Sequence, residues 1–237
     1  MKLYNAWYCP FAQRAWMALV YKGIDFEYVE VDPYDSTEWW IEVSRGAELV
    51  PVLVQANSNG VGETTIVESN RILEYLEDYL PDTNPIFADD PLQRAEQKYW
   101  MDHIGNKITP YLYRFLKASE AGEQRDESRE SLLEGLSTLT QVMDPVGPYF
   151  SGNSVSAVDI ALIPFAYRID VLLGAYRDFK LPQEGSVWQR YHRWYDAMLD
   201  HAAFRTTAFE QGDYEQRLVE HYYPYSLGEG QTDVTRI

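Results

Sequence analysis

The feature that most constrains the fold is a change of pattern at Pro81-Asp82-Thr83-Asn84-Pro85. Before this cluster, stretches with β-like and helical spacing alternate, whereas after Pro91 the spacing is helical almost throughout. Proline cannot continue a helix or donate to a sheet, so the cluster indicates a break between two folding units. We predict one unit over residues 1–80, a linker over 81–90 and an all-helical unit over 91–237.

The first unit combines strands and helices. Runs of β-branched or alternating residues predict strands, and apolar residues three and four positions apart predict helices. The predicted order is strand, helix, strand, helix, strand, strand, helix, over 2–6, 10–21, 26–31, 38–43, 50–54, 64–67 and 69–79. Gly23 should end the first helix, and Asn57-Ser58-Asn59-Gly60 should turn between the last two strands. This order is that of a thioredoxin-like α/β domain.

The second unit is predicted as helices near 91–118, 126–143, 156–175, 186–199 and 202–210, with an irregular stretch from about 211. No run approaches the 18 apolar residues that would suggest a membrane-spanning helix. The first residues also lack the apolar segment of a signal peptide. We therefore expect a cytoplasmic protein.

Charge and cysteine content exclude several functions. The chain has 20 Lys and Arg against 37 Asp and Glu, a net charge of −17. This acidity opposes nucleic acid and anionic membranes as partners, because both are polyanions. One cysteine excludes an intramolecular disulfide framework and a cysteine-rich zinc site. The four histidines have no close metal-ligand spacing, so we predict no metal site.

The single cysteine, Cys9, follows the first predicted strand and directly precedes Pro10. Proline favours the first turn of a helix, which places Cys9 at a helix N-terminus. The positive end of the helix stabilises a thiolate and lowers the pKa of the thiol below about 8.5. This context favours a reactive thiol over a small buried apolar residue. A dithiol oxidoreductase would carry a second cysteine three positions after the first, but position 12 is Ala. A mixed disulfide on Cys9 would therefore have to be resolved by an external thiol.

Two further motifs suggest a ligand site in the first unit. Val50-Pro51 precedes the third predicted strand, and its peptide bond could be either cis, leaving backbone free to bind a peptide-like ligand, or an ordinary trans bond at a strand start. Glu68-Ser69 stands where the last helix of the unit begins. Ser69 could be a simple helix cap, or it could help the helix terminus hold a carboxylate while Glu68 pairs with an ammonium group.

Together these motifs resemble the cytosolic glutathione transferase family, and within it the cysteine-type omega class. The resemblance covers about residues 2–205. It rests on Cys9-Pro10-Phe11-Ala12-Gln13-Arg14, Glu38-Trp39-Trp40, Leu49-Val50-Pro51-Val52-Leu53, Glu68-Ser69 and the helix-capping segment Gly152-Asn153-Ser154-Val155-Ser156-Ala157-Val158-Asp159. The implied fold is a thioredoxin-like domain followed by an all-helical domain.

The resemblance also implies a glutathione site. Cys9 would form a mixed disulfide with glutathione, with Phe11 lining the site. Val50 would bind the cysteinyl part through its backbone, beside a cis Pro51. Glu68 and Ser69 would hold the γ-glutamyl group.

One position departs from the omega pattern. A lysine usually stands two residues before the Glu-Trp pair and faces the glycine carboxylate, but this chain has Ser36 there. Arg45 is the nearest substitute, because we expect Arg14 to pair within the fold. Trp7, Tyr111 and Tyr167 are candidates for an apolar acceptor pocket. A homodimer is expected from the resemblance.

The sequence therefore predicts a glutathione-dependent thiol transferase or reductase, in which dehydroascorbate reduction is one possible activity. Its substrates would be glutathione and a small hydrophobic or glutathionylated compound, with glutathione as co-substrate. The alternatives are a non-catalytic ligand-binding or scaffold protein on the same fold, or a transferase that conjugates glutathione or cleaves ethers or quinones with it.

Overall fold

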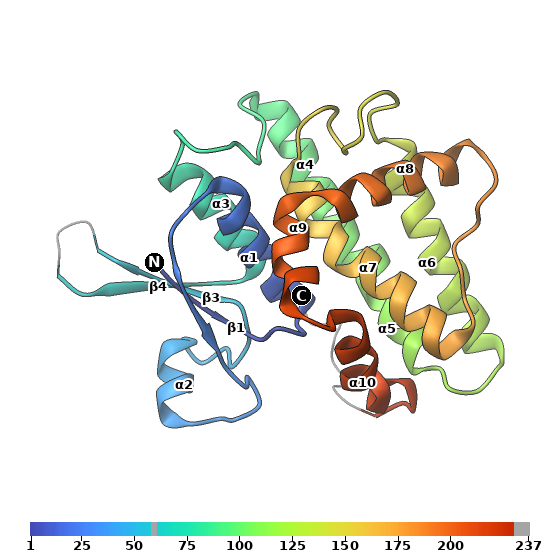
Figure 1. Ribbon diagram of the computed structural model, residues 1–237, viewed down its shortest axis with the longest axis horizontal. Coiled ribbons are helices and arrows are strands. Elements are labelled where there is room, and N and C mark those ends of the chain that lie inside the picture. Colours follow the sequence, from blue (N-terminus) through green and yellow to red (C-terminus); the bar gives the residue numbers. More distant parts are fainter. Residues whose placement is uncertain (58–60, 230–237) are drawn as a thin grey trace. The chain divides into compact units, whose positions relative to one another are not determined.

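The structure is a computed structural model that describes residues 1–57 and 61–229 (Figure 1). Its internal contacts divide the chain into two compact units, of which the first is Met1–Phe87 and the second begins at Ala88. This boundary falls within the segment 81–90. Most of the predicted turn at 57–60, and the end of the chain beyond 229, lie outside the described residues.

The first unit is built on a four-stranded mixed sheet. Its strands are β1 (Lys2–Asn5), β2 (Glu27–Glu30), β3 (Val52–Ala56) and β4 (Glu63–Val67), in the order β2-β1-β3-β4. β1 runs parallel to β2 and antiparallel to β3, so that Leu3 pairs with both Tyr28 and Leu53. β3 and β4 are antiparallel. This topology confirms the predicted thioredoxin-like domain.

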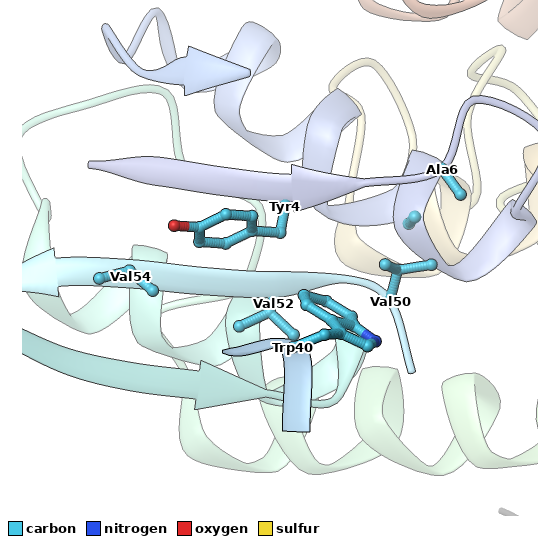
Figure 2. Packing of buried hydrophobic residues seen from close by; sticks show 7 residues of the cluster. Tyr4, Ala6, Trp40, Val50, Val52 and Val54 are labelled. Atoms are coloured by element: carbon cyan, nitrogen blue, oxygen red, sulfur yellow. The ribbon is translucent and has the colours of Figure 1, made fainter. Parts of the chain in front are cut away.

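Helices cover both faces of the sheet. On one face, Tyr4, Val52 and Val54 pack with Trp40 of α2 (Glu38–Val43), whose indole lies beside β3 in Figure 2. Successive side chains of a strand point to opposite faces, so the fully buried Leu3 and Leu53 face the other way. That face is covered by α1 (Pro10–Lys22) and α3 (Ser69–Tyr79), which pack against each other.

The boundaries of α1 follow the sequence signals. Pro10 is its first residue, and Cys9 is the N-cap. Gly23 follows its last residue in the left-handed conformation, with φ at 67°, and donates its N–H to carbonyls of the last turn. Glycine adopts this conformation without a steric cost, so the predicted end at Gly23 is confirmed.

The second unit is helical, as predicted. Its α-helices are α4 (Pro91–His103), α5 (Thr109–Lys117), α6 (Glu123–Gln141), α7 (Ala157–Arg177), α8 (Ser186–Asp200), α9 (Ala202–Thr207) and α10 (Tyr214–Ser226). A short π-helix, η1 (Ile104–Ile108), separates α4 from α5, and a 3₁₀ turn, η2 (Phe209–Gln211), follows α9. Among the described residues, none of the helices is long and apolar enough to cross a membrane.

The single helix predicted over 91–118 is interrupted. Pro110 lies in the first turn of α5. Proline cannot donate the hydrogen bond that a continuous α-helix would need there, and a wider π turn accommodates the loss. The backbone of this turn lies against Gly135 of α6, where an added Cβ would be 2.4 Å from the Lys107 carbonyl oxygen.

The prediction of an irregular stretch from about 211 is wrong for most of its described part. Residues Tyr214–Ser226 form α10, which buries Tyr214, Leu218 and Tyr222. These residues recur every four positions, which is the spacing of one helix face. Pro224 lies in the last turn of α10 and does not prevent the helix.

The predicted capping segment before α7 is confirmed. Ser156 is the N-cap of α7, and its backbone N–H and hydroxyl donate to Asp159 Oδ2 at 2.8 and 2.7 Å. The other carboxylate oxygen accepts from Phe150 N and Trp194 Nε1. Asp159 is fully buried, so the start of α7 is held by a completely enclosed carboxylate.

Candidate active site

Cys9 lies at the N-terminus of α1, as predicted. Its backbone is extended, with φ −79° and ψ 119°, and its side chain makes no capping hydrogen bond. Its backbone N–H donates to the Ala6 carbonyl, and its carbonyl accepts from Gln13 N. The side chain is partly exposed. The thiol therefore stands at the positive end of a helix without serving to cap it.

The chain before β3 approaches this thiol. The Val50–Pro51 peptide bond is cis, as the resemblance implies. The Val50 carbonyl oxygen accepts from the thiol, with Cys9 Sγ at 3.8 Å. Val50 itself is buried and packs in the Trp40 cluster, which consists of Tyr4, Ala6, Ala12, Trp40, Val50, Val52 and Val54 (Figure 2). The packing of α2 against the sheet thus helps to fix the backbone beside the cysteine.

The residue that caps α3 differs from the interpretation of Ser69 as a simple helix cap. The N-cap is Glu68, not Ser69, and its exposed side chain makes no capping bond. Its φ of 71° is unusual for a residue other than glycine. Ser69 is the first residue of the helix and is buried. The Glu68 carboxylate is therefore exposed at the positive end of α3.

Arg14 connects the two helix starts. Its guanidinium is buried, and Nη1 lies 3.4 Å from both Ser69 Oγ and Asn70 Oδ1. The same group lies 5.2 Å from the centre of the Phe11 ring. Arg14 thus pairs within the fold, as predicted, and it joins the helix that carries Cys9 to the helix that begins at Ser69.

Arg45 is placed differently. It is exposed, follows the end of α2, and has a positive φ of 57°. Its Nη1 donates to the Thr65 carbonyl of β4 at 3.2 Å. The structure thus places Cys9 beside Val50 and Arg14 beside Ser69, whereas Arg45 bonds to the edge strand β4.

The three candidates for an acceptor pocket belong to both units. Trp7, in the first unit, donates its backbone N–H to Glu30 and packs edge-on against Tyr8. Tyr111 is half-buried on α5, with the Arg114 guanidinium 5.1 Å from its ring centre. Tyr167 is buried on α7 and stacks on Tyr214. Their role in acceptor binding stays a prediction.

Metal binding finds no support within 1–57 and 61–229. No cluster of three or more His, Cys, Asp or Glu side chains there is arranged to hold a metal ion.

The sequence matches known domain families in both units. Residues 3–83 match the N-terminal domain of glutathione S-transferases, and residues 122–197 match the C-terminal domain. Mouse glutathione S-transferase omega-1 is 31% identical over 172 residues, which cover 73% of this chain and 68% of the mouse protein. The chain belongs to the glutathione S-transferase family.

The relatives of this glutathione S-transferase come from more than one branch. Glutathione S-transferase U22 of Arabidopsis thaliana is 31% identical over 161 residues, covering 68% of this chain and 69% of the plant protein. Among solved structures, glutathione transferase Omega 3C from Trametes versicolor has a TM-score of 0.75 and 32% identity, with 87% of each chain covered. The resemblance to the family and to omega proteins is confirmed.

Sequence reasoning missed two features of this transferase. The contact between Arg14 and the start of α3 joins residues 55 and 56 positions apart, and no local pattern signals such a pairing. The left-handed backbone of Glu68 also lacks a signal, because glycine or asparagine is the usual marker of positive φ.

Proposed function

We propose that this glutathione transferase is an omega-like thiol transferase or reductase that works through a mixed disulfide between Cys9 and glutathione. The observation that carries the proposal is the partly exposed thiol at the N-terminus of α1, beside the Val50 carbonyl. Transferase activity with glutathione as co-substrate follows from family membership. The cysteine adds a nucleophile of its own to that activity.

The surrounding groups suit the parts of glutathione. The backbone of Val50 would bind the cysteinyl part, which places the glutathione sulfur near Cys9, and Phe11 would line the site. The exposed Glu68 carboxylate would pair with the ammonium of the γ-glutamyl group, and Ser69 with its carboxylate. Arg45 would supply positive charge for the glycine carboxylate.

The proposed reaction has two displacement steps. The Cys9 thiolate attacks the glutathione sulfur of a glutathionylated substrate, which forms the enzyme–glutathione disulfide and releases the substrate as a thiolate that takes up a proton. The thiolate of a second glutathione then attacks the sulfur of the bound glutathione. Glutathione disulfide leaves, and the Cys9 thiolate is restored. The chain contains one cysteine, so the second thiol comes from solution.

Conjugation of glutathione to an electrophile is the second candidate. The likeness to a plant glutathione transferase supports it. This reaction needs a group that stabilises the glutathione thiolate, and Tyr8 is the better-placed hydroxyl because Tyr4 is buried in the Trp40 cluster. Cleavage of an ether or quinone by glutathione would use the same groups. A non-catalytic binding role is the remaining alternative.

The test compares wild-type protein with Cys9→Ser. Wild-type protein should reduce hydroxyethyl disulfide with glutathione. The rate at which iodoacetamide alkylates Cys9 should reach half of its maximum below about pH 8.5. Cys9→Ser should lose the reduction, and conjugation of glutathione to a chloronitrobenzene should not fall with it. Disulfide reduction that survives in Cys9→Ser contradicts the assigned nucleophile. No reduction and no conjugation by the wild type would favour the binding role.

A second pair of variants tests glutathione recognition. Glu68→Gln should raise the KM for glutathione about tenfold, because a neutral amide loses the charged pairing with the ammonium group. Glu74→Gln, on the same helix, is the matched control and should leave this KM unchanged. Equal effects of the two variants would contradict the role of Glu68.

A further inference from the structure

A groove in the second unit is lined by residues of α7, α8, η2 and α10. It consists of two neighbouring open pockets of about 520 and 460 Å³, which share the lining residues Tyr167, Phe209, Glu215 and Val219. Cavities of this size commonly hold small organic ligands. The described residues that line the groove all belong to the second unit, and none of them is a residue proposed for thiol transfer.

The groove has aromatic walls. The Tyr167 ring stacks on Tyr214 at 5.9 Å between ring centres and meets Phe209 edge-on at 5.8 Å. The outward face of an aromatic ring attracts cations. Phe209 already does so, because the Arg205 guanidinium of α9 lies 5.8 Å from its ring centre.

The charged side chains that line the groove are all acidic, namely Asp170, Asp213, Glu215 and Glu220, and none of the described lining residues is Lys or Arg. Two arginines lie just behind the lining: Arg205 packs on the Phe209 ring, and the buried Arg168 donates to the Tyr214 hydroxyl at 3.1 Å. Asp170 is held in place by the Tyr195 hydroxyl, 3.1 Å from its Oδ2.

The pKa values of two groove tyrosines are raised, chiefly by burial. Burial raises the pKa of Tyr167 and the Glu215 carboxylate raises it further, while the nearby Arg168 guanidinium lowers it. The pKa of Tyr195 is likewise raised by burial and then by Asp170. Carboxylates that oppose ionisation of a hydroxyl would favour a positive charge at the same place.

We propose that this groove binds an organic cation that has an apolar body and a positively charged nitrogen group. The aromatic rings would contact the body and attract the charge, and the carboxylates would pair with the charged nitrogen group. Tyr167, predicted from the sequence to bind an acceptor substrate, becomes in this proposal a wall of the cation groove. Thiol transfer by Cys9 is not needed for it.

The floor of the groove offers a way to block it without changing charge. Gly174 of α7 lines the groove, and an added Cβ would meet only the Phe179 carbonyl, at 3.9 Å. A Cβ at this position therefore makes only an ordinary van der Waals contact. Leucine is also a better helix former than glycine, so Gly174→Leu should fill the groove and leave the helix intact.

The experiment uses two xanthene dyes of similar shape and opposite charge, the cation rhodamine 6G and the anion fluorescein. Their fluorescence anisotropy is titrated with the full chain at about 0.15 M salt, where charges more than about 8 Å apart are largely screened. The groove variants are Gly174→Leu and the nearly isosteric double change Asp170→Asn with Glu215→Gln. The matched control is Glu130→Gln with Glu134→Gln, which removes the same charge from the exposed surface of α6.

Wild-type protein should bind rhodamine 6G and not fluorescein. Each groove variant should weaken binding at least about tenfold, while the α6 control stays within about twofold. Cys9→Ser should bind the dye as wild type does, which separates this result from the outcome for thiol transfer. Equal losses in the groove and control double variants, unchanged binding by Gly174→Leu, or binding of both dyes would overturn the proposal.

Discussion

The helices α1 and α7 begin with polar side chains in very different surroundings. At the start of α7, the Asp159 carboxylate is fully buried and accepts four hydrogen bonds, from Ser156, Phe150 and Trp194. At the start of α1, Cys9 makes no capping bond and is partly exposed. Both side chains experience the positive end of a helix. The difference indicates that a helix terminus stabilises the fold when its donors are used, and supports chemistry when a side chain there remains accessible.

The largest expected effect is that of Asp159→Ala on stability. The change leaves the Phe150, Ser156 and Trp194 donors buried without their acceptor, at about 1–3 kcal/mol each. Burial raises the pKa of the Asp159 carboxyl, although the hydrogen bonds oppose this rise. Burying the charged carboxylate therefore costs some free energy, and removing it recovers part of the stability that the lost hydrogen bonds supplied. The net loss in free energy of unfolding should be roughly 3 kcal/mol or more, measured by urea denaturation.

Cys9→Ala is the counterpart for α1. It removes no hydrogen bond that caps the helix, so its effect on the free energy of unfolding should stay below about 1 kcal/mol. A loss as large as that of Asp159→Ala would mean that Cys9 serves the fold as Asp159 does, and the contrast between the two helix starts would fail.

Gly135→Ala should have the next largest effect and tests how strictly the second unit is packed. The new methyl group would lie 2.4 Å from the Lys107 carbonyl oxygen, so α6 and η1 must separate. We expect a loss of about 1–3 kcal/mol in the free energy of unfolding. Gly174→Ala is the control, because its methyl group makes only an ordinary van der Waals contact, 3.9 Å from the Phe179 carbonyl oxygen, and it should be neutral or stabilising by up to about 1 kcal/mol. Equal stabilities of the two variants would contradict the close approach.

The smallest effect concerns Asp144, a partly exposed counterpart of Asp159. Its Oδ1 accepts from Val146 N and Gly147 N at 2.9 and 2.6 Å, and the bond from Gly147 is the main cause of a lowered pKa. A depressed pKa adds stability that is present above the ordinary value of 3.8 and is lost as pH falls through the folded-state pKa. Asp144→Asn should therefore lower the Tm near pH 6 and have less effect near pH 3. A constant difference in Tm would contradict this assignment.

The sequence predicted the features that depend on local chemistry. The order of elements in the first unit, the end of α1 at Gly23 and the capping segment at Ser156 each follow from a short motif. Cys9 was placed correctly because the position of Pro10 at a helix start is itself a local preference.

Two predictions for the second unit differ from the structure. The helix predicted near 91–118 includes Pro110, which accompanies a π turn between α4 and α5. The stretch from about 211 is predicted to be irregular, although Tyr214, Leu218 and Tyr222 have the spacing of one helix face and form the buried side of α10.

Other features depend on long-range packing. Arg14 meets the start of α3 only because α1 and α3 cover the same face of the sheet. The groove of Tyr167 likewise needs α7, α8 and α10 to pack together, so its carboxylates could not be grouped from the sequence. Contacts of this kind become predictable only when the helix arrangement is known.

The backbone of Glu68 has a consequence for how this protein could be improved or could evolve. A non-glycine residue held at a φ of 71° costs on the order of 1–3 kcal/mol, and glycine would remove that cost. Selection for thermal robustness alone would therefore favour glycine at position 68. A screen for more robust variants should be expected to find this substitution, and such variants would lose the carboxylate proposed to recognise glutathione.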